Sequence, residues 1–161
     1  HEKDGKIIQE LYPKIKKPFN HEVQEISFDQ PFQLKTTLNK DSSLNLGGFK
    51  IDIQDDCLHL NREEVSIQEN KYVMFVSPKL QGHYDIELYY DHHVFEIYIN
   101  GGEYVMSQVV YDLNDQVIFK IQSISLCQII INSFSHKQCE YYPCHQLDEI
   151  IVCFVIAHYI F

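Results

Sequence analysis

The residues of this sequence that could do chemistry are concentrated between positions 84 and 110, where Asp91 and Glu96 lie five positions apart. Two carboxyl groups held about 5 Å apart can hydrolyse a glycosidic bond, one as nucleophile and the other as acid and base. Residues at this spacing on a strand, a turn and a second strand are rarely held at that distance. We therefore expect structural or surface roles for Asp91 and Glu96, and no catalytic residue in this chain.

Histidine and cysteine side chains are the other chemical candidates, because both bind metal ions. His92 and His93 are adjacent, and neighbours on a strand point to opposite faces, so a shared ion is not expected. Cys139, Cys144 and His145 have a loosely ligand-like spacing but lack the second ligand pair of a structural zinc site. The sequence therefore predicts no metal site and no other cofactor.

Composition excludes several classes of partner. The 161 residues carry 23 acidic and 13 basic side chains, a formal net charge of −10, and no basic cluster larger than residues 14–17, so no nucleic-acid partner is expected. The apolar run at 150–161 is shorter than the about 20 residues of a membrane-spanning helix, so no membrane partner is expected either. Five cysteines without disulfide-framework spacing favour a reducing compartment, the cytoplasm.

Alternating apolar residues predict the strands that must position these groups. Residues 84–90 alternate with apolar side chains at even positions, whereas residues 94–99 carry them at odd positions. This change of phase requires a turn or bulge at His92. Asn100-Gly101 is the strongest short hairpin signal, because both residue types tolerate positive φ angles.

Further strands are expected at 32–38, 49–53, 58–60, 117–122 and 126–132, and one at 72–76 that reads as buried on both faces. Short strands at regular spacing with turn signals between them predict an all-β fold, a two-sheet antiparallel β-sandwich of the jelly-roll or lectin-like kind. We divide the chain into a linker from a preceding domain (1–20), the sandwich (21–134), and a Cys-containing apolar tail (135–161) that reads as a strand or a short helix.

Three motifs resemble the C-terminal β-sandwich of glycoside hydrolase family 32, the invertases, sucrose-6-phosphate hydrolases and fructan hydrolases. Residues 91–103 read D-H-H-V-F-E-I-Y-I-N-G-G-E, residues 58–62 read L-H-L-N-R, and residues 3–9 read K-D-G-K-I-I-Q, which is similar to the segment that enters the family's linker. The matching positions, for which the resemblance implies structural or sugar-proximal roles, are Asp91, Glu96, Asn100, Gly102, Glu103 and Arg62. His93 and Asn61 depart from the family pattern, which has Ser and Asp there.

In that family, catalysis belongs to a five-bladed propeller that precedes the sandwich. Its motifs are Trp-x-Asn-Asp-Pro, Arg-Asp-Pro and Glu-Cys. This sequence has no Trp and no Asp-Pro pair, and none of its five cysteines follows a Glu. The resemblance therefore implies a non-catalytic module, inactive alone. Its partner would be the N-terminal propeller of a parent enzyme that hydrolyses sucrose, sucrose 6-phosphate or a fructan.

Two other readings stay open at the level of sequence. The chain could be an autonomous carbohydrate-binding module, since Tyr89, Tyr98 and Tyr104 lie on or beside the hairpin and outward tyrosines can stack on sugars. Tyrosine is also simply a good strand former. The third reading is an interaction domain with an apolar outer patch, which predicts a homodimer. Self-association is also expected if a sandwich exposes a former interdomain surface.

Overall fold

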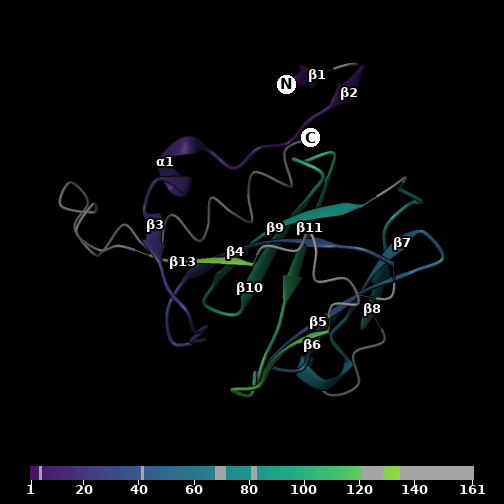
Figure 1. Cartoon of the computed structure of the whole chain (residues 1–161). Coiled ribbons are helices and arrows are strands. Elements are labelled where there is room, and N and C mark those ends of the chain that lie inside the picture. The colour runs from purple at the N-terminus through teal and green to yellow at the C-terminus, as the bar shows by residue number, and fades with distance from the viewer. Residues whose placement is uncertain (4, 41, 68–71, 81–82, 121–128, 135–161) are drawn as a thin grey trace.

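Two antiparallel sheets packed face to face make up the structure (Figure 1). The computed structural model describes residues 1–3, 5–40, 42–67, 72–80, 83–120 and 129–134. In this part of the chain, the helices are α1 (Pro13–Lys16) and the 3-10 turn η1 (Glu63–Val65). The predicted two-sheet β-sandwich is therefore confirmed. The expected tail at 135–161, with Cys139, Cys144 and His145, lies outside the described residues.

The larger sheet has six strands in the order β11-β10-β9-β4-β13-β3, all antiparallel. Their bounds are β3 (Phe19–Glu22), β4 (Phe32–Leu38), β9 (Tyr84–Asp91), β10 (Val94–Ile99), β11 (Tyr104–Val109) and β13 (Ile130–Phe134). β3 and β11 are therefore its two edges.

The smaller sheet has five strands in the order β12-β5-β6-β7-β8. Their bounds are β5 (Ser43–Leu46), β6 (Phe49–Gln54), β7 (Cys57–Asn61), β8 (Met74–Val76) and β12 (Val117–Lys120). Before the sandwich, β1 (Glu2–Lys3) and β2 (Lys6–Ile7) form a short ribbon near the N-terminus (Figure 1).

The core lies between the sheets and is built by strand alternation. On β9, the even-numbered residues of 84–90 face inward, and on β10 the odd-numbered residues of 95–99 do so. The two sheets meet where Phe95 of β10 stacks on Phe49 of β6, with ring centroids 4.9 Å apart and both side chains fully buried. This aromatic contact joins the two layers.

Tight turns set the register of neighbouring strands. Gln54 pairs with Cys57 and Asp91 pairs with Val94, which leaves two residues in each turn. Both residues of each turn have positive φ angles: Asp55 50°, Asp56 62°, His92 41° and His93 74°. A two-residue loop with positive φ at both positions has a backbone twist that matches the right-handed twist of the flanking strands. The predicted phase change at His92 is thus a turn, and the predicted Asn100-Gly101 hairpin is also present.

The strand predicted at 72–76 differs from its prediction. Residues 72–76 were expected to be buried on both faces, but only Met74–Val76 form a strand, and it lies at the edge of the five-stranded sheet. Met74 is 55% and Val76 48% exposed. A short apolar run is typical of both a central strand and an uncovered edge, and only the topology separates the two.

Replacing Phe95 by Ala tests the contact between the layers. We expect Phe95→Ala to lower the free energy of unfolding by about 3–5 kcal/mol, because it removes a buried ring and leaves a cavity. Urea unfolding followed by circular dichroism measures this. The control is Ile118→Ala, at a side chain that is 52% exposed, where we expect a change within about 0.5 kcal/mol. Equal losses in the two variants would contradict the packing described here.

Candidate functional site

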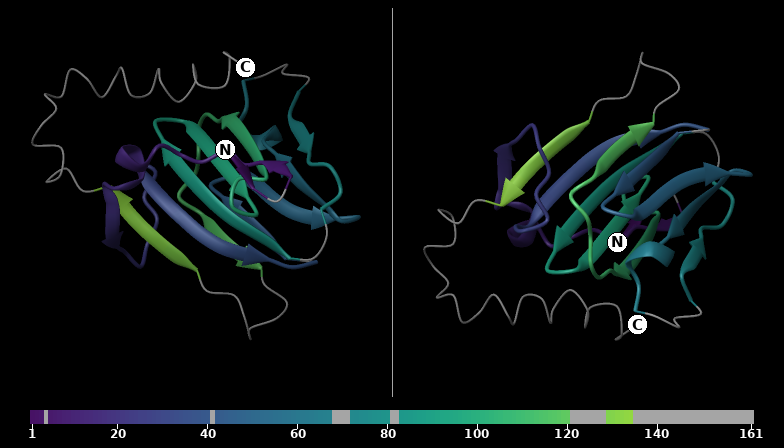
Figure 2. Two further views of the ribbon diagram at one scale, coloured as in Figure 1. Left: turned by 90° about the horizontal axis from the view of Figure 1, so that it is seen from above. Right: turned by 90° about the horizontal axis from the view of Figure 1, so that it is seen from below.

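The outer face of the six-stranded sheet is the part of the sandwich that holds the N-terminal segment. Within the expected linker at 1–20, residues 6–19 contain β2 and α1 and lead into β3 at Phe19, and we call this part the linker. Figure 2 shows this segment lying across the six-stranded sheet before it joins the sheet at β3. Three sets of contacts fasten it: the hairpin between β10 and β11, a small apolar cluster, and a polar network.

The hairpin receives the linker through the backbone of Gly102. Gln9 N–H donates to Gly102 O at 3.0 Å, and Gly102 has a φ of +93°. A Cβ atom at position 102 would lie 1.8 Å from Gln9 O, far inside van der Waals contact. Glycine is therefore required here for two reasons, its backbone conformation and the close approach of the linker.

Side chains of the same hairpin reinforce this contact. Glu103 accepts a hydrogen bond from Lys6 Nζ at 2.6 Å, which ties β2 to the sandwich. Asn100 fixes the hairpin itself: its Oδ1 accepts from Asp85 N–H at 3.0 Å, and its own N–H donates to Asp85 O at 2.9 Å. Three of the six predicted family-motif residues therefore gather at one place, where the linker crosses.

The apolar cluster contains Tyr89 and Tyr98, which the carbohydrate-binding alternative requires to be accessible. They are 2% and 7% exposed, and they form a small second core with Leu11 and Phe19 of the linker region. Tyr89 packs edge to face against both Phe19 and Tyr98, at 5.3 Å and 5.9 Å. They do lie on the outer face, as the alternation indicates, but the linker covers that face, which the sandwich pattern alone does not show.

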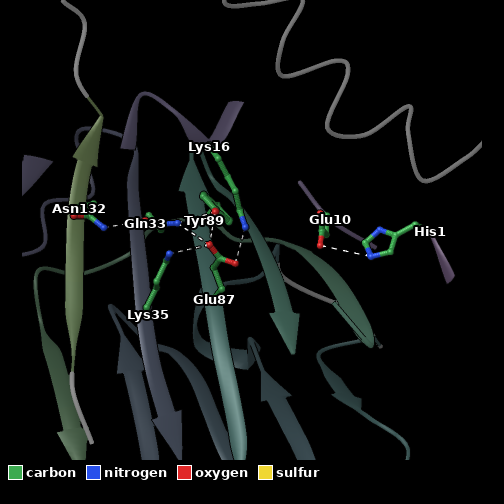
Figure 3. A network of polar contacts seen from close by, with 8 residues as sticks. All are labelled: His1, Glu10, Lys16, Gln33, Lys35, Glu87, Tyr89 and Asn132. Carbon is green, nitrogen blue, oxygen red and sulfur yellow. Dashed lines mark hydrogen bonds and ion pairs between the residues drawn. The ribbon is translucent and has the colours of Figure 1, made fainter. Parts of the chain in front are cut away.

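The polar network centres on Glu87 of β9 (Figure 3). Its Oε1 accepts hydrogen bonds from Tyr89 OH at 2.6 Å and from Gln33 Nε2 at 2.8 Å. Its Oε2 accepts from Lys16 Nζ of α1 at 3.0 Å, and Lys35 Nζ lies 3.3 Å from Oε1. One carboxylate thus joins the linker helix to two neighbouring strands of the sheet.

These contacts shift the ionisation of the groups in the network. Burial alone would raise the pKa of Glu87, but the hydrogen bonds from Tyr89 and Lys16 and the charges of Lys16 and Lys35 outweigh it and lower the pKa below its ordinary value. Burial, followed by the Glu87 carboxylate, raises the pKa of the Tyr89 hydroxyl. Burial and then the Glu96 charge raise that of Tyr98. Glu87 is therefore held ionised and both tyrosines are held neutral.

The remaining predicted residues lie away from the turn of the hairpin, where the linker crosses. Glu96 accepts from Ser107 Oγ at 2.6 Å on the neighbouring strand. Asp91 pairs with His92 in the turn at the other end of β10. Arg62 donates to Tyr72 O at 2.9 Å and to Val109 O at 2.7 Å, and so connects the two sheets at their edges. Asp91 and Glu96 thus have separate partners.

Tyr104, the third tyrosine proposed for sugar stacking, is half-buried and packs against the main core. It pairs with Ile99, whose side chain also faces inward.

Among the described residues, no three His, Cys, Asp or Glu side chains group as metal ligands. In the same part of the chain, no helix has the length and apolar character needed to cross a membrane. The chemistry that these residues support is binding and positioning of a polypeptide segment.

Sequence reasoning did not find Glu87, Gln33 or Lys16. The alternation of residues 84–90 places Glu87 on the outer face of its strand, but its partners Gln33 and Lys16 come from positions far away in the sequence. The signal that links them is the register of β4 against β9, which places Lys35 opposite Glu87 and Gln33 opposite Tyr89. Pairing of β4 with β9 cannot be read from the sequence, because the chain passes through four strands of the other sheet, β5 to β8, between them.

The fold and this site define a β-sandwich module with a docked N-terminal linker. Residues 19–130, more than half of the chain, match the family described as "Glycosyl hydrolases family 32 C terminal". The chain belongs to that family. A search of curated proteins gave no match.

A solved structure, "Structure of sucrose-6-phosphate hydrolase from Lactobacillus gasseri", is similar to this chain with a TM-score of 0.68 and 21% sequence identity. The similarity covers 83% of this chain and 32% of the hydrolase chain. This chain therefore spans about a third of the length of that hydrolase, and the likeness is one of fold.

A substitution pair tests the approach of the linker to the hairpin. We expect Gly102→Ala to displace Gln9, because the added Cβ overlaps Gln9 O, whereas Gly101→Ala has no atom within 4 Å of its Cβ. Both glycines have positive φ angles, so backbone strain is common to the two variants. Hydrogen exchange at the Gln9 amide should accelerate at least tenfold in Gly102→Ala only. Equal acceleration in both variants would rule out a specific contact.

The lowered pKa of Glu87 predicts how stability depends on pH. Because folding lowers the pKa of Glu87 below its ordinary value, the contribution of Glu87 is complete at pH values above that ordinary value and is lost as pH falls through the lowered pKa. We expect Glu87→Gln to lower the free energy of unfolding at pH 7 by about 1–3 kcal/mol. The neutral amide has one acceptor oxygen in place of two, so some donors of the network lose their partner.

Urea unfolding at pH 7 and at pH 3 measures this effect, and the difference between wild type and Glu87→Gln should shrink at pH 3. Asp85→Asn is the control, since Asp85 lies on the same face of β9 but is exposed. A difference that stays constant with pH would show that the Glu87 charge does not hold the linker.

Proposed function

We propose that this chain is the C-terminal module of a β-fructofuranosidase-type glycoside hydrolase, and that it holds and stabilises an N-terminal five-bladed propeller. The parent enzyme would hydrolyse a terminal β-fructofuranosyl bond in sucrose, sucrose 6-phosphate or a fructan. Membership of the family and the name of the similar hydrolase support this class of substrate. The module itself is non-catalytic.

The observation that carries the proposal is the docking of the linker. A segment that merely tethered two domains would need no partners, but this one has contacts from Lys6 to Phe19. Backbone, apolar and ionic contacts act together, so that the linker leaves the sandwich in one direction. A linker held in this way limits the positions that a preceding domain can take. The module therefore serves to orient the propeller as well as to stabilise it.

Carbohydrate binding by the isolated module is the alternative, and the buried state of Tyr89 and Tyr98 counts against it. Sugar stacking needs an accessible ring face. With the linker docked, Leu11 and Phe19 pack against these two tyrosines. Affinity gel electrophoresis through levan, inulin and plain gels separates the two functions, and we expect equal mobility in all three.

The test of the proposed function starts from the gene. We expect the coding sequence upstream of His1 to contain Trp-x-Asn-Asp-Pro, Arg-Asp-Pro and Glu-Cys in that order. The protein translated from the whole gene should release fructose or fructose 6-phosphate from at least one of sucrose, sucrose 6-phosphate, inulin and levan. The chain described here should release none. A gene without these motifs, or hydrolysis by this chain alone, would overturn the proposal.

A further inference from the structure

One side of the sandwich carries most of its exposed apolar side chains. This side lies between the edge strands β8 and β11, away from β3 and β13 (Figure 2). Of the nine large hydrophobic side chains exposed in the described part of the chain, six lie along it: Ile67, Tyr72, Met74, Val76, Val109 and Tyr111. We call these six residues the apolar side. Apolar groups clustered on a surface mark a contact with another protein surface.

Polar contacts show that β8 and β11 run along the same side. At one end, Arg62 donates both to Tyr72 O, just before β8, and to Val109 O, at the end of β11. Tyr111 N–H also donates to Val65 O at 2.7 Å. At the other end, Lys79 and Leu80 line an open hollow of about 290 Å³ together with Lys6, Asn100 and Glu103. The start of the β8 segment therefore lies beside the end of β11, and its end lies beside the start of β11.

The backbone of β8 presents hydrogen-bonding groups to this side. Arg62 N–H bonds to Val73 O, and Ser77 N–H bonds to Leu58 O, so the odd-numbered residues face β7. In an antiparallel ladder the alternate residues point the other way, which directs the N–H and C=O groups of Met74 and Val76 to the open edge. Proteins usually protect such edges with charged residues. β8 reads Met-Phe-Val and has none.

The linker begins at the same side. Lys6 of β2 lines the hollow at its end and is bonded to Glu103, and Gln9 is bonded to Gly102. A domain attached ahead of the linker would therefore be tethered beside the apolar side. Tethering raises the effective concentration of two surfaces to about millimolar when the linker is short, which favours their contact. The apolar side is thus continuous with the contact that the linker already makes.

We propose that the apolar side, with the open edge of β8, is the surface on which the N-terminal propeller of the same polypeptide packs. The inference rests on the proposed function and names the surface that it uses. Contact there covers the exposed side chains of β8 and supplies hydrogen-bond partners for the open backbone groups of Met74 and Val76. Interdomain contacts of this kind bury about 600–1,500 Å².

Hydrogen exchange in the protein translated from the whole gene tests this surface against the isolated chain. We expect the amides of Met74 and Val76 to exchange at least tenfold more slowly in the whole protein. The amides of β12 are the matched control, because β12 is the other edge of the five-stranded sheet and carries the exposed Ile118. They should exchange at the same rate in both proteins.

Two charge-introducing variants sharpen the test. Met74→Asp and Ile118→Asp each place a carboxylate at a half-exposed apolar position on an edge strand. In the isolated chain both should melt within about 2 °C of wild type. In the whole protein, calorimetry should show a single transition for wild type and Ile118→Asp, and two separate transitions for Met74→Asp.

Each opposing result identifies a different failure. A whole protein that hydrolyses fructofuranosides but leaves Met74 and Val76 exchange unchanged would overturn the docking surface and leave the proposed function standing. Protection that appears in the isolated chain and grows with its concentration would also overturn the inference, since the occupant would be a second copy of this chain. A whole protein without hydrolase activity would instead contradict the proposed function.

Discussion

The close contact between the backbones of Gln9 and Gly102 is the constraint on which the rest of the account depends. It fixes the point at which the N-terminal segment meets the sandwich, and it allows no side chain at position 102. From that point the linker runs across the outer face of the six-stranded sheet, where Tyr89 and Tyr98 pack beneath it and Glu87 binds Lys16. One hairpin geometry thus decides which face of the sandwich is covered.

The contacts along the linker differ in strength and in sensitivity to solution conditions. The apolar cluster is buried, and its contribution comes from apolar surface removed from water. The Glu87 network depends on an ionised carboxylate with four donors or cations around it, whose half-buried position protects it from screening better than a surface pair. The pair between Lys6 and Glu103 is more exposed and contributes least. The linker is therefore held mainly at α1 and at the hairpin backbone.

Much of the fold could be predicted from the sequence because local patterns determine it. Alternation fixed the inward faces of β9 and β10, and the change of phase between Tyr90 and Phe95 located the turn at His92. The rest depends on pairing between distant segments. The exposed edge position of β8 follows from the strand order, and the burial of Tyr89 and Tyr98 follows from the path of the linker. Neither leaves a periodic signal in the sequence.

The candidate site also contains residues that local sequence predicts and residues that only the pairing of distant segments brings together. The hairpin residues Asn100, Gly102 and Glu103 were found through their motif, and the structure gives each a contact that explains its type. Glu87 belongs to no motif, yet it has more polar partners than any of these three. A family motif therefore identified the backbone anchor of the linker, while the ionic anchor required the register of β4 and β9.

The central claim is that the docked linker holds a preceding domain in one position relative to the sandwich. Small-angle X-ray scattering of the protein translated from the whole gene tests this most directly. The account predicts one compact interdomain distance distribution for wild type, and a broader distribution shifted to longer distances for Gly102→Ala. Scattering curves that coincide for the two proteins would contradict the claim that this contact orients the domains.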